Sequence, residues 1–134
     1  QQALGLLEEM QKLGLVPDVI SYSAAISACE KGGQWQPGLR LLAEMQKADI
    51  VPDVIIYNAT LSACEKGGQW QQALGLLAKM HKAVLVPDDV SYNAAISACE
   101  KGEQWQQSLT LLAEMKQTDL VPDVISYNAM VSAL

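Results

Sequence analysis

Apolar and polar residues follow a helical spacing along most of this chain. After Asp18, the apolar side chains of Tyr22, Ile26 and Cys29 lie three or four residues apart, which places them on one face of an α-helix. Asp18 is a good N-cap residue, and the proline before it ends the preceding segment. The pattern therefore predicts an amphipathic helix over about residues 19–31.

A second amphipathic segment follows a pair of glycines, Gly32 and Gly33, which end the first helix. Its apolar positions are Trp35, Leu39, Leu42 and Met45. Their spacing predicts a second helix over about residues 34–47, with the tryptophan buried beside the leucines. Pro37 lies in the first turn of this helix, where a missing N–H costs little.

The whole pattern returns every 35 residues. The recurring positions are Pro17, Pro52, Pro87 and Pro122; Tyr22, Tyr57, Tyr92 and Tyr127; Met10, Met45, Met80 and Met115; Cys29, Cys64 and Cys99; and Trp35, Trp70 and Trp105. Self-similarity at a period of roughly 20–50 residues is typical of solenoids, in which each unit buries its apolar face against its neighbours. We therefore predict an all-α fold, an α-solenoid superhelix of stacked antiparallel helix pairs.

The repeat boundaries follow if each unit begins directly after a Pro-Asp pair. Complete repeats are then predicted at 19–53, 54–88 and 89–123. Residues 1–18 would supply the second helix of a partial repeat, and residues 124–134 the first helix of another. Because the sequence starts and stops within repeats, we expect it to be a section of a longer array.

A second face of the first helix is polar except at its first position. In the first complete unit this face comprises Ile20, Ser23, Ser27 and Glu30, with Lys31 close by. The same positions in the next two units are Ile55, Asn58, Ser62, Glu65 and Lys66, and then Val90, Asn93, Ser97, Glu100 and Lys101. Stacked side by side, these positions form a ladder. Such a ladder is either a solvated helix face or a surface that reads a linear ligand one unit at a time.

Composition narrows the functional classes. The chain has 134 residues, of which 50% are hydrophobic, with 15 acidic against 9 basic side chains and a net charge of −6. This balance disfavours a general nucleic-acid binder, because phosphate neutralisation needs Lys and Arg. No apolar run is long enough to span a bilayer. No nucleophile–base pair, phosphate loop or paired carboxylate pattern occurs, so we predict no enzymatic activity and no cofactor.

The cysteines and the single histidine do not suggest a metal site. One cysteine per unit puts neighbouring thiols about 10 Å apart, which is too far for a shared zinc ion or a disulfide. We expect Cys29, Cys64 and Cys99 in the core, and His81 at the surface.

The sequence resembles the pentatricopeptide repeat (PPR) family over its whole length. The resemblance rests on the 35-residue period, on two helices per unit, and on runs such as V-P-D-V-I-S-Y and A-C-E-K-G-G-Q-W-Q-Q-A-L-G-L-L-A. The tetratricopeptide repeat is the nearest competitor, but it has a period of about 34 residues and a pattern keyed to other positions. The V-P-D junction favours the PPR family.

The resemblance implies a single-stranded RNA-binding module that reads one base per repeat, in mitochondria or plastids. The base-selecting positions are the fifth residues, Ser23, Asn58, Asn93 and Asn128, and the last residues, Asp18, Asp53, Asp88 and Asp123. The base-sandwiching positions are Ile20, Ile55, Val90 and Ile125, and the phosphate-contact positions are Lys31, Lys66 and Lys101. By the same resemblance, Ser with Asp favours G and Asn with Asp favours U, which gives 5′-GUU-3′.

Two other functions stay open at this stage. The acidic charge and the partial terminal repeats also fit a helical-repeat scaffold that binds protein subunits of a larger assembly. An RNA-processing enzyme would need a catalytic domain outside this sequence. The aspartates have a further role available as helix N-caps, which are worth about 1 kcal/mol each.

Overall fold

The computed structural model describes residues 2–118, and these form seven α-helices with no strand among them. In chain order the helices are α1 (Gln2–Lys12), α2 (Val19–Lys31), α3 (Trp35–Lys47), α4 (Val54–Lys66), α5 (Trp70–Lys82), α6 (Asp89–Lys101) and α7 (Trp105–Gln117). The predicted all-α architecture is confirmed for this range. Predictions for Asp123, Ile125, Asn128 and the helix in 124–134 lie outside the described residues.

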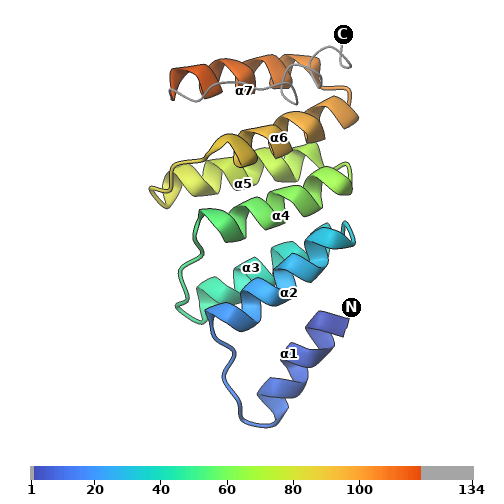
Figure 1. Ribbon diagram of the computed structural model, residues 1–134, viewed down its shortest axis with the longest axis vertical. Helices are drawn as coiled ribbons and strands as arrows, with labels where there is room; N and C mark the ends of the chain where they lie inside the picture. Colours follow the sequence, from blue (N-terminus) through green and yellow to red (C-terminus); the bar gives the residue numbers. More distant parts are fainter. Residues whose placement is uncertain (1, 119–134) are drawn as a thin grey trace.

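The helices stack into two layers, as Figure 1 shows. The first helices of successive pairs, α2, α4 and α6, pack side by side along the array. Each second helix lies behind them: α3 packs on α2 and α4, α5 packs on α4 and α6, and α7 packs on α6. Every interior helix therefore contacts neighbours in more than one unit. Within the described range, no helix combines the length and apolar character that a bilayer span needs.

The first helices begin at aspartate caps. The side chains of Asp18, Asp53 and Asp88 each accept a hydrogen bond from the backbone N–H three residues later. These bonds satisfy one of the four N–H groups that a helix N-terminus leaves open. The N-cap role anticipated from the sequence is therefore confirmed for these three residues.

The core is a continuous column of aliphatic, tyrosyl and thiol side chains. It includes Tyr57 and Leu61 of α4, and Leu76 and Met80 of α5, all fully buried, with equivalents in the neighbouring units. The three cysteines are buried in the same column, as predicted. Burial of an aliphatic side chain of this size contributes about 1.5–3 kcal/mol, so the stacked faces dominate the stability.

The tryptophans do not occupy the core, and the prediction that they do is wrong. Trp35 and Trp70 are only partly buried, and Trp105 is 43% exposed. Trp70 stands at the start of α5, and its indole covers Gly102 in the turn of the following unit. A Cβ atom on that glycine would come within 2.3 Å of the indole Cδ1. The tryptophan therefore packs against backbone between units, outside the leucine layer.

Each helix pair also relies on residues in the left-handed backbone region. The second helices α1, α3 and α5 are each followed by a residue with φ near +60 to +80°: Gly14, Asp49 and Val84. After α5, the Val84 N–H bonds to the His81 carbonyl and the Leu85 N–H bonds to the Met80 carbonyl. This is the Schellman arrangement that usually takes glycine. A β-branched residue there is strained.

We predict that Val84→Gly stabilises the chain by about 1 kcal/mol, because it relieves a left-handed conformation that costs an L-residue roughly 1–2 kcal/mol. Val84 is 88% exposed, so little burial is lost. The measurement is chemical denaturation. Val86→Gly is the matched control, since Val86 is also exposed but lies outside the left-handed region. Stabilisation by both variants, or by neither, would contradict the strain at Val84.

Candidate functional site

One surface of the first-helix layer carries a line of exposed aliphatic side chains. Ile20, Ile55 and Val90 are the second residues of their units, and they are 73%, 77% and 51% exposed. They lie in the first turns of α2, α4 and α6, which pack side by side. The repeat therefore presents one apolar side chain per unit at the same place. Each is available to contact a flat ligand group between adjacent units.

Beside this line, the structure joins the fifth and last residues of the central unit. Asn58 donates a hydrogen bond from Nδ2 to Oδ1 of Asp88, at 3.0 Å. Asn58 is only 9% exposed, and its Oδ1 accepts a hydrogen bond from the Ser91 hydroxyl in the next unit. The sequence places Asn58 on an open polar face, but the structure largely buries it against Asp88 and Ser91 at the junction with the next unit.

The amide of Asn58 keeps some capacity to bind a ligand. An asparagine side chain has two N–H donors and an oxygen with two lone pairs. Asp88 takes one donor and Ser91 takes one lone pair. One N–H donor and one oxygen lone pair of Asn58 therefore remain. They can pair with a ligand whose edge offers one acceptor and one donor.

Among the described residues, the pair predicted for the preceding unit differs from this one. Between Ser23 and Asp53, both within the described range, there is no hydrogen bond, and Asp53 caps Ile56 alone. The partner expected for Asn93 is Asp123, which is outside that range. Asp18 caps Ser21 at the start of α2. The structure thus brings together one of the predicted base-selecting pairs.

The hydrogen bonds at these caps change the acidity of two carboxyl groups. Partial burial of Asp88 opposes ionisation, but the Ser91 backbone N–H, the Asn58 amide and the Ser91 hydroxyl outweigh it and lower the pKa of Asp88 below its usual 3.8. The pKa of Asp18 is lowered by the backbone N–H and the hydroxyl of Ser21. Both carboxylates are therefore ionised near neutral pH.

The lysines of the ladder pair with glutamates of the preceding unit. Lys66 forms an ion pair with Glu30, and Lys101 forms one with Glu65. Lys101 Nζ also lies 3.4 Å from the Glu65 carbonyl oxygen. These pairs tie one first helix to the next. They also offset the charge of two of the three lysines that the sequence assigned to phosphate contacts.

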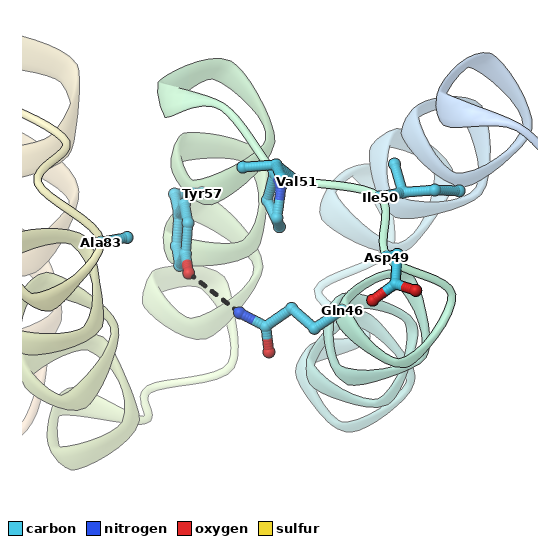
Figure 2. Close-up of a pocket in the computed structure, with 7 residues that line it drawn as sticks. Gln46, Asp49, Ile50, Val51, Tyr57 and Ala83 are labelled. Atoms are coloured by element: carbon cyan, nitrogen blue, oxygen red, sulfur yellow. Dashed lines mark hydrogen bonds between the residues drawn. The ribbon is translucent and has the colours of Figure 1, made fainter.

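The buried tyrosines Tyr22 and Tyr57 line recesses at the junctions between units. Tyr57 extends into a recess of about 270 Å³ at the junction between units, where its hydroxyl oxygen accepts a hydrogen bond from Gln46 Nε2 at 3.4 Å (Figure 2). One period earlier, Tyr22 lines an equivalent recess. Burial raises the pKa of Tyr57, partly opposed by the bond from Gln46. The tyrosines thus support the junctions.

The cysteine thiols are buried and unreactive. Burial raises the pKa of Cys64 and of Cys99 to about 11, so the nucleophilic thiolate is scarce near neutral pH. Among the described residues, no three His, Cys, Asp or Glu side chains are grouped to hold a metal ion.

These features define a helical-repeat protein with one apolar and one polar contact position per unit. Comparison with protein families agrees with this class. Residues 20–50 match the PPR repeat, and residues 52–101 and 87–134 match the PPR repeat family. The chain belongs to the PPR repeat family.

Two solved structures of PPR10 are similar to this chain. The pentatricopeptide repeat protein PPR10 from maize matches with 27% identity and a TM-score of 0.81, over 97% of this chain and 18% of that one. PPR10 in complex with an 18-nt psaJ RNA element matches with 26% identity and the same TM-score, over 98% and 19%. The present chain thus spans about a fifth of PPR10.

A third structure supports the fold alone. The PPR domain of Arabidopsis thaliana protein-only RNase P 1, in complex with tRNA, has 16% identity and a TM-score of 0.85, over 98% of this chain and 70% of that one. Comparison with curated protein sequences gave no match.

Two features of the site escaped the sequence analysis. Ser91, the third residue of its unit, contacts Asn58 across the junction, and the pattern gave it no role. The sequence places Glu30 and Glu65 next to lysines of their own units, whereas they pair with the lysines 36 residues later, Lys66 and Lys101. In the sequence, only the recurrence of the Glu-Lys pair at each period pointed to these ion pairs between units.

We predict that Asp88→Ala lowers the free energy of unfolding by about 1 kcal/mol near neutral pH, because the helix loses its N-cap. A carboxyl group with a lowered folded pKa stabilises the fold above its unfolded pKa, and this contribution is lost as the pH falls through the folded value. The difference in the free energy of unfolding between wild type and Asp88→Ala should therefore narrow below pH 3.8.

Denaturation at a series of pH values measures this effect. Asp53→Ala is the control, because Asp53 caps α4 without an asparagine partner, and its loss should have a smaller effect. If the difference in the free energy of unfolding between wild type and Asp88→Ala stays constant at acidic pH, the charge of the carboxylate does not contribute to the stability of the fold.

Proposed function

We propose that this chain is a single-stranded RNA-binding module that reads one base per repeat, with the preference 5′-GUU-3′ across its three complete units. The observation that carries the proposal is the hydrogen bond from Asn58 to Asp88 beside the exposed Ile55 and Val90. In this proposal, Asn58 contacts the edge of a base whose faces Ile55 and Val90 contact. Membership of the PPR family and the RNA-bound structure of PPR10 support it.

The hydrogen-bonding groups that remain on Asn58 fit a pyrimidine. Uracil offers a carbonyl acceptor and an N–H donor on its pairing edge, which match the remaining donor and acceptor of Asn58. The aliphatic side chains of Ile55 and Val90 give dispersion contacts to the base faces without choosing a sequence. Ser23 is shorter than asparagine and leaves room for a purine in the first unit.

In this proposal, the chain binds RNA without acting on it and works in mitochondria or plastids, as its family resemblance implies. Binding by these units alone is weak and nearly independent of salt. Lys66 and Lys101 already pair with glutamates, and the net charge is −6. Few counterions are then released when RNA binds.

A scaffold function is the second candidate. Val16, Val51 and Val86 recur at the junctions and are strongly exposed, so they form an apolar line that a protein subunit could cover. A complex that survives nuclease and high salt but is lost in Val51→Ser would favour this function over RNA binding.

We predict that Asn58→Ser changes the preferred middle base from U to G. The expected change in the affinity ratio is about fivefold, equivalent to one hydrogen bond of roughly 1 kcal/mol. Fluorescence anisotropy with short RNAs that differ only at the middle base of GUU measures the ratio. Gln71→Ser, at an exposed position of α5, is the control. An unchanged preference in Asn58→Ser would rule out base reading by this residue.

We also predict that the double variant Glu30→Gln, Glu65→Gln binds RNA more tightly than wild type, because it frees Lys66 and Lys101 for phosphates. The plot of log affinity against log salt should steepen by about 0.7 for each freed lysine. Glu8→Gln, Glu9→Gln removes the same charge from exposed positions of α1. Equal effects of the two double variants would mean that net charge acts and the ion pairs do not.

A further inference from the structure

We propose that a third residue with a hydroxyl group fixes the orientation of an asparagine at the fifth position of the unit before it, which makes Ser91 a positioning residue for base reading by Asn58. This inference rests on the proposed RNA-binding function. It extends that function to a side chain that is fully buried and cannot itself touch RNA.

The contacts of Ser91 connect two units. Its hydroxyl oxygen accepts a hydrogen bond from the Asp88 backbone N–H at 3.1 Å. Its backbone N–H donates to Asp88 Oδ1 at 3.0 Å, which completes the capping box of α6. The hydroxyl also reaches Oδ1 of Asn58, 33 residues earlier in the sequence. One serine therefore joins the start of α6 to Asn58 on α4.

Counting protons decides where the hydroxyl donates. The Ser91 hydroxyl has one proton and two acceptors in reach, Asn58 Oδ1 and Asp88 Oδ1. Asp88 Oδ1 already accepts from the Ser91 N–H and from Asn58 Nδ2. Asn58 Oδ1 is the nearer acceptor. The Ser91 hydroxyl therefore donates its proton to Asn58 Oδ1.

This arrangement gives the amide a fixed direction. Asp88 can only accept, so it holds the nitrogen of Asn58, and the Ser91 proton holds the oxygen. Rotating the amide by half a turn would set its oxygen against a carboxylate, lose the bond to Asp88 and leave the Ser91 proton without the asparagine oxygen as its acceptor. The direction matters because uracil and cytosine differ in which position of the pairing edge donates and which accepts. A fixed amide matches one pyrimidine, whereas a rotating amide matches both.

The other junctions in the sequence follow the same rule. Asn58 is followed by Ser91 and Asn93 by Ser126, whereas Ser23 is followed by Ile56 at the equivalent place. Ile56 is buried and has no hydroxyl group, and Asp53 keeps only the bond from the Ile56 N–H. In this chain, the junction that lacks the hydroxyl is also the junction that has no asparagine to orient.

The test compares Ser91→Ala with Ser21→Ala in the full chain. Ser21 forms the same capping box with Asp18, so Ser21→Ala measures the loss of the cap alone, whereas Ser91→Ala also loses the bond to Asn58 and should lower the melting temperature further. Within the described residues, Ser21 contacts no base-reading asparagine, so only Ser91→Ala should alter discrimination. The readout is the ratio of affinities for RNAs with U or C at the middle base of GUU. Ser91→Ala should reduce this ratio about fivefold.

Two further variants guard against a purely structural effect. Ser91→Thr keeps the hydroxyl and should restore the ratio. Ser23→Asn combined with Ile56→Thr should create a preference for U over C at the first base, whereas Ser23→Asn alone should not. The side-chain amide signals of Asn58 in NMR should move in Ser91→Ala and stay in place in Ser21→Ala.

The outcomes separate this inference from the function on which it rests. Wild type that does not bind these RNAs would overturn both. Wild type that prefers U, together with a Ser91→Ala variant that keeps the same ratio and the same Asn58 signals, would overturn the positioning role alone. An equal loss of the ratio in Ser21→Ala would also overturn it, because the effect would then come from general destabilisation.

Discussion

Packing between units is the constraint on which this structure depends. No helix pair can bury its apolar faces by itself, and each interior helix finds its partners in the unit before or after it. α4 contacts α2, α3, α5 and α6, so Tyr57 and Leu61 are buried only because both neighbouring units are present. The gain from this burial is large enough to hold a valine in the left-handed region after α5.

The same packing determines the geometry of the candidate site. Because α2, α4 and α6 lie side by side in equivalent positions, an exposed position of one unit recurs at the same place in the next. The aliphatic line of Ile20, Ile55 and Val90 follows from this, and so do the ion pairs between successive units. A linear ligand with a regular spacing is the kind of partner that such a surface suits.

The sequence was sufficient to predict the helices, their caps and the layer that holds the cysteines, because these depend on local spacing and on one recurring aspartate. It could not show the side chains that act across a junction. The tryptophan at the start of α5 has helical spacing with the leucines, yet it covers a glycine of the next unit. Glu65 and Lys66 are adjacent in sequence, and adjacent helix residues do not face each other, so their true partners depend on the offset between units.

The hydrogen bonds around Asn58 also have a consequence for protein engineering. A repeat is usually exchanged as the segment that folds as one helix pair, which here would be 54–88. The side chains that fix the amide are Asp88, at the end of that segment, and Ser91, beyond it. Under the proposed function, a transplanted unit keeps its own selectivity only if its boundary is moved to include the third residue of the following unit. The group of side chains that fixes Asn58 is therefore offset from the helix pair that folds as one unit.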